Sequence, residues 1–342
     1  MTADGTDSFQ STDRASLRDV ATLAGVSVAS ASNVLNHRRR RDDLIGKAVL
    51  AAAEHLGYRA NAMAANLRRA TSRLIGVVLP DFENAYFGAL LSALQREAAT
   101  SNYRLTAATS HDRPDLEARE VGALLDWRVA GLIVAPTMSS LPDSFASTGV
   151  PIVVVDRVAG AMSADEVSAD NAAAACEVTR QLIALGHRHI LVAHSDPLAL
   201  NMAERIRGVR KAASDLGADV RLDPLNCGWT VESADQAFEA RLASGAAPTA
   251  IFALNNLAAL AAFGAVSRCG IIPGRDIALV SFDDATWMAH MHPAIAAIAQ
   301  PVDAIAHHAW SRLLARIEGE AGQVQSIRVP CQINPRGSMV PP

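Results

Sequence analysis

Polar residues that follow apolar segments are the part of this sequence best placed to do chemistry. Asp156 closes the apolar run 151–155, Asn255 follows the run 249–254, and Asp283 follows the run 277–282. Carboxylates and amides can pair with neighbouring hydroxyl groups of a small polar molecule. If the three apolar runs are strands of parallel sheets, these side chains belong to a ligand cleft.

Catalytic motifs are absent from the sequence. It has no G-x-G-x-x-G, G-x-x-x-x-G-K-[ST], G-x-S-x-G or H-E-x-x-H pattern. The histidines, including His307 and His308, lack ligand-like spacing with Cys or Asp, so we expect no metal and no cofactor. The four cysteines lie far apart without a C-x-x-C pair, which favours reduced thiols over zinc or disulfides. The sequence predicts a binding protein and not an enzyme.

Short apolar runs alternate with helical patterns over most of the chain. The runs are 74–79, 105–108, 131–135, 151–156, 189–193, 249–254 and 277–282. Helices are expected near 85–101, 116–127, 171–185, 202–216, 231–244 and 256–269. Apolar strands separated by helices indicate parallel sheets covered on both faces. Two such halves predict an α/β core of two Rossmann-like subdomains with a ligand cleft at the strand ends.

Residues 17–37 predict two short helices joined by a tight turn. Gly25 can take the positive φ of the turn, and Ser27 is a candidate N-cap. The first helix has an apolar face of Leu17, Val20, Ala21 and Ala24. The second helix turns Ala31, Val34 and Leu35 inward and leaves outward Val28, Ala29, Ser32, Asn33 and Asn36. The pattern fits a DNA-binding helix-turn-helix, or a helical hairpin that serves packing alone.

An arginine run separates this pair from a third helix, expected over Asp43–Leu56. Four consecutive arginines, residues 38–41, cannot pack in a core, so they form an exposed loop that either contacts phosphates or is simply solvated. Gly46 inside the helix should cost about 1 kcal/mol relative to Ala. Gly57 is placed to end the helix, whose expected buried stripe is Ala48, Val49, Ala52 and Leu56.

Charge is distributed unevenly along the chain. Residues 14–73 hold eleven Lys/Arg and four Asp/Glu, although the whole chain of 342 residues has a net charge of −4. A basic segment on an acidic body favours a DNA-binding head, and a solvated basic face is the alternative. The polar first 15 residues predict a disordered tail and no secretory signal, and no apolar run is long enough for a membrane span.

The N-terminal segment carries a family resemblance. The run DVATLAGVSVASASNVLN, residues 19–36, is similar to the signature of the LacI/GalR family of bacterial transcriptional repressors. The resemblance continues through Tyr58-Arg59-Ala60-Asn61-Ala62 and into Leu185-Gly186-His187-Arg188. It implies an all-α helix-turn-helix DNA-binding head with a hinge helix, followed by an α/β core that is periplasmic binding protein-like. It also implies a homodimer that binds a pseudo-palindromic operator under the control of a small-molecule effector.

The resemblance places the DNA contacts in the head and in a hinge helix over 61–69. Asn33 is expected to pair with adenine and His37 with a base edge or phosphate, while Val28 and Ala29 reach thymine methyl groups. Leu67 falls at the lever position that wedges a base step in the minor groove, with Arg68 beside it. The full expected set is Ser27, Val28, Ala29, Ser32, Asn33, His37, Arg40, Asn61, Ala64, Leu67 and Arg68. Relatives often carry Tyr, Thr or Gln at the positions of Val28 and Ala29 and Arg at the position of Asn33, so the half-site is expected to be unusual. Relatives also carry other residues at Arg41 and at Ile45-Gly46, which leaves the conformation of the loop and one phosphate contact open.

The same resemblance adds four residues to the effector site. Arg205 lies in an Arg-x-x-Gly element, and Gln300 matches a polar position where the chain crosses between subdomains. Trp229 matches an aromatic that stacks on the effector, and Phe87 lies where a second aromatic wall is found. With Asp156, Asn255 and Asp283 they predict a site for a sugar or a nucleoside. Taken singly, each residue also has a packing or capping interpretation. Asn256, where many relatives have Asp, leaves the identity of the effector open.

These expectations define the domain organisation. The predicted parts are a tail (1–15), a helix-turn-helix domain (16–60), a hinge helix and linker (61–73), and two core subdomains (74–169 with 301–322, and 170–300 with 323–342). The chain is predicted to cross between subdomains near residues 170, 300 and 322. The predicted function is a cytoplasmic, nucleoid-associated transcriptional regulator. A solute-binding protein and a cytosolic α/β enzyme are the alternatives that share the core fold.

Overall fold

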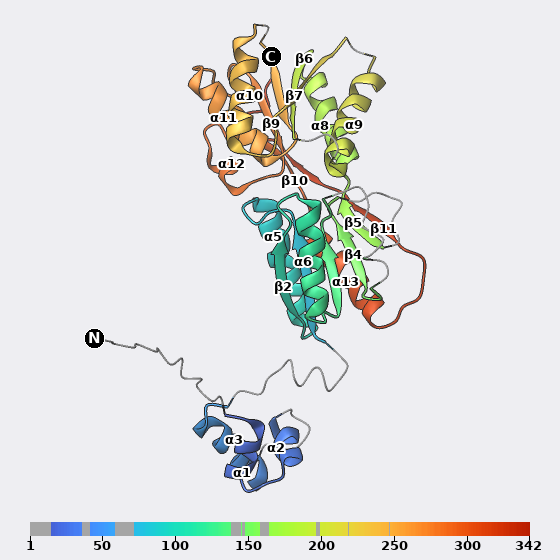
Figure 1. Ribbon diagram of the computed structural model, residues 1–342. Coiled ribbons are helices and arrows are strands. Elements are labelled where there is room, and N and C mark those ends of the chain that lie inside the picture. Colours follow the sequence, from blue (N-terminus) through green and yellow to red (C-terminus); the bar gives the residue numbers. More distant parts are fainter. Residues whose placement is uncertain are drawn as a thin grey trace, which may run out of the picture. The chain divides into compact units, whose positions relative to one another are not determined.

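The chain divides into two compact units in a computed structural model (Figure 1). The units are residues 1–72 and 73–342, and each is described by itself. The structure describes residues 15–35, 42–58, 72–137, 145, 148–157, 164–195, 199–217, 219–245 and 247–342. Within these residues no helix is both long enough and apolar enough to cross a membrane.

The first unit contains three short helices around a small apolar core. They are α1 (Leu17–Leu23), α2 (Val28–Leu35) and α3 (Leu44–His55). Gly25 has a φ of 65°, and the Ser27 hydroxyl accepts a hydrogen bond from the amide of Ser30 at 3.1 Å. The predicted turn and N-cap are therefore present. The core of this unit is formed by Val20, Ala21, Ala31, Val34, Val49, Ala52 and Ala53.

The third helix differs from its predicted burial pattern. Asp43 is its N-cap, and the side chain accepts a hydrogen bond from the amide of Gly46 at 2.6 Å. This cap places Gly46 on the buried face, together with Val49, Ala52 and Ala53. The prediction that Ala48 is buried is wrong, because Ala48 is exposed, and Leu56 is only half-buried. Since Gly46 lies in the first turn, its amide is held by the cap and not by the helical ladder.

The second unit consists of two α/β lobes, each built on a sheet of six strands. The first sheet has the order β11-β5-β4-β3-β1-β2, and all of its strands are parallel. Its strands are β1 (Leu74–Leu79), β2 (Arg104–Thr109), β3 (Gly131–Val134), β4 (Ile152–Val155), β5 (Asp165–Ala169) and β11 (Ser326–Val329). The helices α5 (Ala85–Thr100), α6 (Pro114–Asp126) and α13 (Val302–Ile317) belong to this lobe.

The second lobe repeats the architecture with one antiparallel strand at the edge. Its sheet has the order β12-β10-β9-β8-β6-β7, and β12 runs antiparallel to β10. The strands are β6 (His189–His194), β7 (Arg221–Asn226), β8 (Ala250–Ala253), β9 (Ala278–Phe282), β10 (Ala296–Ala299) and β12 (Gln332–Asn334). The helices are α8 (Asn171–Ala184), α9 (Leu200–Asp215), α10 (Val231–Ala243), α11 (Asn256–Arg268) and α12 (Thr286–His290), seen around this sheet in Figure 1.

The chain passes between the lobes three times, and one passage differs from the prediction. It crosses between β5 and α8, between β10 and α13, and between β11 and β12. The third crossing was expected at Gly322, but β11 pairs with β5, with Ser326 opposite Glu166 and Val329 opposite Ala169. Residues 323–329 therefore belong to the first lobe. Because β11 is a short edge strand with only two apolar residues, periodicity did not reveal it.

Candidate effector site and DNA-binding helix

A small cavity lies between the two lobes, at the carboxyl ends of their strands. All seven predicted effector residues line it, namely Phe87, Asp156, Arg205, Trp229, Asn255, Asp283 and Gln300. Its volume is about 50 Å³, whereas small-molecule sites usually measure about 300–1,000 Å³.

One aspartate from each lobe is turned into the cavity by an unusual backbone conformation. Asp156 directly follows β4 and has a φ of 64°, and Asp283 directly follows β9 with a φ of 73°. Aspartate tolerates this left-handed region better than most residues, although the conformation still costs free energy. Such strain concentrates at ligand sites. The two turns place a carboxylate on each side of the cavity.

Burial governs the charge state of Asp156. The side chain is almost inaccessible, and this burial raises the pKa of its carboxyl, while Arg205 and Arg157 oppose the shift. The amide of Asn201, at the start of α9, donates a hydrogen bond to Oδ2 of Asp156 at 2.8 Å. The carboxylate keeps acceptor capacity for a ligand hydroxyl.

Arg205 is held rigidly by groups of the second lobe. Its Nε donates to Oδ1 of Asn171 at 2.9 Å, and its Nη1 donates to the carbonyl of Leu254 at 2.7 Å. Nη1 also lies 3.9 Å from Oδ2 of Asp283, and the guanidinium stacks 3.7 Å from the ring centroid of Phe282. Arg205 is buried, so it is not a surface charge.

Three side-chain contacts connect the lobes across the cavity. Asn256 donates to Oδ1 of Asn84 at 3.1 Å, and Asn201 donates to Asp156. The guanidinium of Arg157 lies over the ring of Trp229. The N-cap of α11 is Asn255, whose Oδ1 accepts a hydrogen bond from the amide of Ala258 at 2.7 Å.

Several buried polar atoms at this cavity have no hydrogen-bond partner among the described residues. They are the Tyr86 hydroxyl, Nε of Arg157 and Oε1 of Gln300. Burial also raises the pKa of Tyr86 well above its ordinary value, so its hydroxyl is a neutral donor. An unpaired buried polar group costs roughly 1–3 kcal/mol. A ligand that carries several hydroxyl groups would satisfy them.

Sequence reasoning selected seven of the lining residues and left out six. The six are Asn84, Tyr86, Arg157, Ser195, Asn201 and Met202. Ser195 immediately follows β6 and Arg157 lies two residues after the end of β4, so the strand-end rule used for Asp156 could have found both. Asn201 and Met202 lie in the first turn of α9, the helix that follows β6. That position offered a weaker signal, because a helix start near the strand ends was predicted only approximately.

The candidate DNA-binding surface of the first unit is the outward face of α2. Val28, Ala29 and Asn33 are exposed, and Ser32 is half-buried. Ser27 is exposed, and its hydroxyl is engaged in the helix cap. The remaining predicted contacts lie outside the described residues, namely His37, Arg40, Asn61, Ala64, Leu67 and Arg68.

The fold and the site together define a class of protein: a helix-turn-helix unit on the same chain as a two-lobed α/β core with a polar cavity between the lobes. Residues 16–61 match the family described as bacterial regulatory proteins of the lacI family, and residues 179–339 match a periplasmic binding protein-like domain. The chain belongs to the lacI family. It is a DNA-binding transcriptional regulator and not an enzyme.

Individual relatives agree with this assignment. The chain is 31% identical to the HTH-type transcriptional regulator PtxS of Pseudomonas putida, over 96% of this chain and 97% of that protein. It is also 31% identical to the HTH-type transcriptional repressor PurR of Klebsiella pneumoniae, over 92% and 94% of the two chains. The Lac repressor dimer bound to operator and the anti-inducer ONPF has a similar fold, with a TM-score of 0.83, 24% identity and coverage of 95% and 99%.

Proposed function

We propose that this regulator is a repressor whose affinity for operator DNA is controlled by a sugar or nucleoside bound between the lobes. The single observation that carries the proposal is the cluster of unpaired polar atoms at the cavity, on Tyr86, Arg157 and Gln300. A molecule with several adjacent hydroxyl groups matches these atoms and the carboxylates of Asp156 and Asp283. Trp229, 45% exposed, offers an aromatic face for an apolar sugar or base surface.

Solved structures with the same fold support this ligand class. A lacI-family regulator from Enterococcus faecium has bound ribose and a TM-score of 0.70, and the regulator CelR is in complex with cellobiose at a TM-score of 0.70. A ribose operon repressor from Burkholderia thailandensis is 27% identical to this chain over 77% of its length. Sugars are thus bound or sensed by proteins with this core.

Binding is coupled to the angle between the lobes. The cavity of about 50 Å³ is too small for a sugar, so the contacts that close it must open or rearrange. The contacts Asn256–Asn84 and Asn201–Asp156 each join one lobe to the other. An effector that replaces these contacts changes the preferred lobe angle, because it binds one arrangement better than the other. We propose that segment 61–73, which precedes the first lobe, responds to this change in lobe angle.

In this proposal, the protein binds its operator as a dimer that reads two half-sites. Two copies of α2, one from each subunit, occupy successive major grooves of a pseudo-palindrome. Asn33 pairs with adenine, and Val28 and Ala29 contact thymine methyl groups. Leu67 and Arg68 act in the minor groove, where Leu67 wedges a base step. Binding to chromosomal DNA places the protein in the bacterial cytoplasm.

Footprinting on the intergenic DNA upstream of its own gene tests the proposal. The purified full chain is assayed at about 0.1 M salt, where phosphate contacts still contribute strongly, with and without a panel of sugars and nucleosides. We expect a protected pseudo-palindrome whose protection one compound weakens or strengthens. Protection that no compound of the panel alters would contradict the effector class, and absence of protection would contradict operator binding. Leu67→Ala should reduce DNA bending, and unchanged bending would refute the lever.

A further inference from the structure

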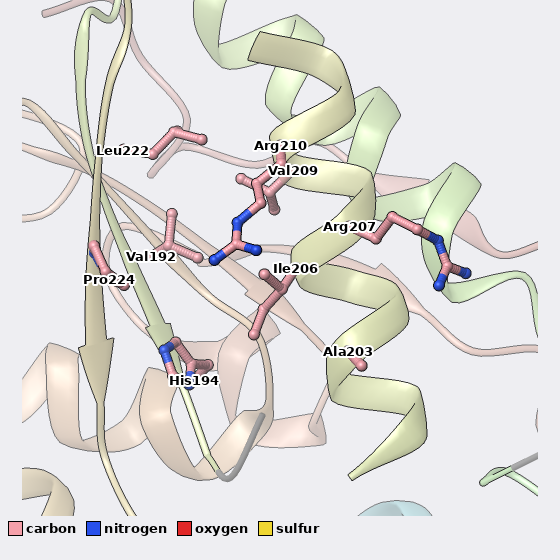
Figure 2. Close-up of a pocket in the computed structure, with 9 residues that line it drawn as sticks. All are labelled: Val192, His194, Ala203, Ile206, Arg207, Val209, Arg210, Leu222 and Pro224. Carbon is pink, nitrogen blue, oxygen red and sulfur yellow. The ribbon is translucent and has the colours of Figure 1, made fainter. Parts of the chain in front are cut away.

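A second cavity lies entirely within the second lobe, between α9 and the strands β6 and β7 (Figure 2). Its volume is about 620 Å³, within the range of about 300–1,000 Å³ that small-molecule sites occupy. Apolar side chains line most of it, namely Val192, Ala203, Ile206, Val209, Leu222 and Pro224. Leu222 and Pro224 come from β7, the edge strand of the sheet.

The helix α9 packs closely against α8 at Gly208. An added Cβ on Gly208 would lie 2.2 Å from the carbonyl oxygen of Ala172, so this glycine permits an approach that no other residue allows. The cavity occupies the gap between α9 and the strands β6 and β7. Figure 2 shows Ile206 extending from α9 into this gap toward His194.

Two polar groups face the apolar walls. His194 is 7% exposed, and its Nδ1 lies 2.6 Å from the carbonyl oxygen of Ser195, so Nδ1 carries the proton. Its Nε2 has no hydrogen-bond partner among the residues that the structure describes. The guanidinium of Arg210 extends from α9 toward the strands (Figure 2) and forms no ion pair with any described residue.

Arg207 provides an internal contrast on the same helix. Arg207 also borders the cavity, but its side chain extends away from the strands in Figure 2, and its Nη2 lies 3.7 Å from Oε1 of Glu204. Arg210, three residues further along α9, is thus the arginine that points into the cavity without a carboxylate partner among the described residues. A single guanidinium above an apolar floor matches one carboxylate attached to an apolar body.

We propose that this cavity is a second ligand site, specific for an apolar monocarboxylate whose carboxylate binds Arg210. The apolar body of the ligand lies along Val192, Ile206 and Leu222, and His194 Nε2 is available to one further polar group of the ligand. The site is separate from the cavity between the lobes, which α9 lines with Asn201, Met202 and Arg205. Because α9 contributes to both cavities, a ligand in either one contacts the same helix.

Calorimetric titration of the full chain with 1-naphthylacetate tests the proposal. The uncharged analogue 1-naphthylacetamide keeps the apolar body and removes the charge, and it should bind at least about tenfold more weakly, because charge-assisted hydrogen bonds are the strong ones. Arg210→Gln should weaken naphthylacetate binding by about tenfold or more. The matched variant Lys211→Gln, on α9 but outside the residues that line the cavity, should change it by less than about twofold.

Ile206→Trp fills the cavity and should abolish binding. An unchanged circular dichroism spectrum verifies that this variant folds. If it does not fold, Arg210→Gln supplies the test, because Arg210 is exposed and its replacement should not affect folding. Absence of saturable naphthylacetate binding would overturn the proposal. Binding that persists at full strength in both Arg210→Gln and Ile206→Trp would also overturn it, because the ligand would then lie elsewhere.

Discussion

The guanidinium of Arg157 lies over the indole ring of Trp229, with 5.6 Å between Cζ and the ring centroid. Arg157 follows β4 of the first lobe, and Trp229 precedes α10 of the second, so this stacking spans the cavity between the lobes. Arg157 is also paired with Asp112 within its own lobe. An effector that stacks on the face of Trp229 covered by Arg157 must displace the arginine, so ligand binding and this contact between the lobes compete for the same aromatic face.

Replacing this aromatic face should weaken effector binding. Trp229→Ala is expected to reduce effector affinity roughly 10- to 100-fold, because it removes a large stacking surface. Stability should change by no more than about 0.5 kcal/mol, since the side chain is 45% exposed. Calorimetric titration with the compound identified by footprinting measures the effect. Trp127→Ala, at a residue that is 54% exposed and outside the cavity, is the control and should bind normally.

Effector affinity should fall in acid. Burial raises the pKa of Asp156, so its carboxylate becomes protonated at a higher pH than an ordinary aspartate, whose pKa is about 3.9. Protonation removes acceptor capacity for ligand hydroxyl groups, and affinity should decline as the pH falls through this raised pKa. Titrations between roughly pH 7.5 and pH 4.5 measure the decline. The variant Asp156→Asn should bind the effector weakly, and its affinity should depend less on pH. A decline in affinity as steep as that of the wild type would exclude Asp156 as the cause.

Asn33 should contribute to operator recognition but not to the stability of the first unit. The residue is exposed on α2, so Asn33→Ala should leave the unfolding temperature of the first unit unchanged. Loss of a bidentate contact to adenine should cost roughly 1–3 kcal/mol of specific binding, or about 5- to 150-fold. Nonspecific DNA provides the control, because its affinity rests on phosphate contacts and should not change. Equal losses on both DNAs would mean that Asn33 does not read a base.

Much of the core could be predicted because its central strands are apolar on both faces. β1, β3, β4, β6, β8 and β9 were all found, since helices cover both sides of a parallel sheet. β5 was missed because it contains Asp165 and Glu166, both buried. Asp165 is held in the core by Arg316 at 2.8 Å and by Arg312 at 3.3 Å, both from α13. Such tertiary ion pairs allow a polar sequence to form an inner strand, and no local pattern reveals them.

The position of the cavity between the lobes could be predicted from the sequence, but the side-chain contacts inside the cavity could not. Parallel strands bring Asp156 to the carboxyl edge of the first sheet and Asn255 and Asp283 to that of the second, and this follows from the order of strands and helices. That Arg157 and Trp229 stack across the lobes depends on how the lobes meet, which periodicity does not encode. The unpaired hydroxyl of Tyr86 is likewise visible only in three dimensions.

His187 should make the stability of the second lobe sensitive to acid. Its Nε2 donates to the carbonyl of Val340 at 2.8 Å, and Nδ1 contacts Oγ1 of Thr249 at 2.9 Å. Burial lowers the pKa of this ring below its ordinary value near 6.5, so folding favours the neutral form. The stabilisation is fully present above about pH 6.5 and is lost as the pH falls through the lowered pKa of the folded state.

Unfolding curves at about pH 7.5 and pH 5.5 should reveal this contribution. His187→Gln is expected to lose roughly 2 kcal/mol at the higher pH, because the buried partners are left imperfectly paired, and less at the lower pH. His290→Gln, at an exposed histidine, is the control and should unfold as the wild type does at both values. A loss for His187→Gln that is identical at both pH values would contradict the proposed role of the neutral ring.

Gly208 should be the position on α9 least tolerant of a methyl group. A Cβ there would lie 2.2 Å from the carbonyl oxygen of Ala172 and 3.0 Å from the amide nitrogen of Cys176, and both are backbone atoms that cannot turn aside. Gly208→Ala should therefore force α9 away from α8 and cost about 3 kcal/mol or more. Gly122→Ala is the matched control in α6, because no atom lies within 4 Å of its added Cβ. It should gain up to about 1 kcal/mol from helix propensity. Thermal unfolding of both full-length variants measures the difference, and equal melting temperatures would show that the α8–α9 contact adjusts freely.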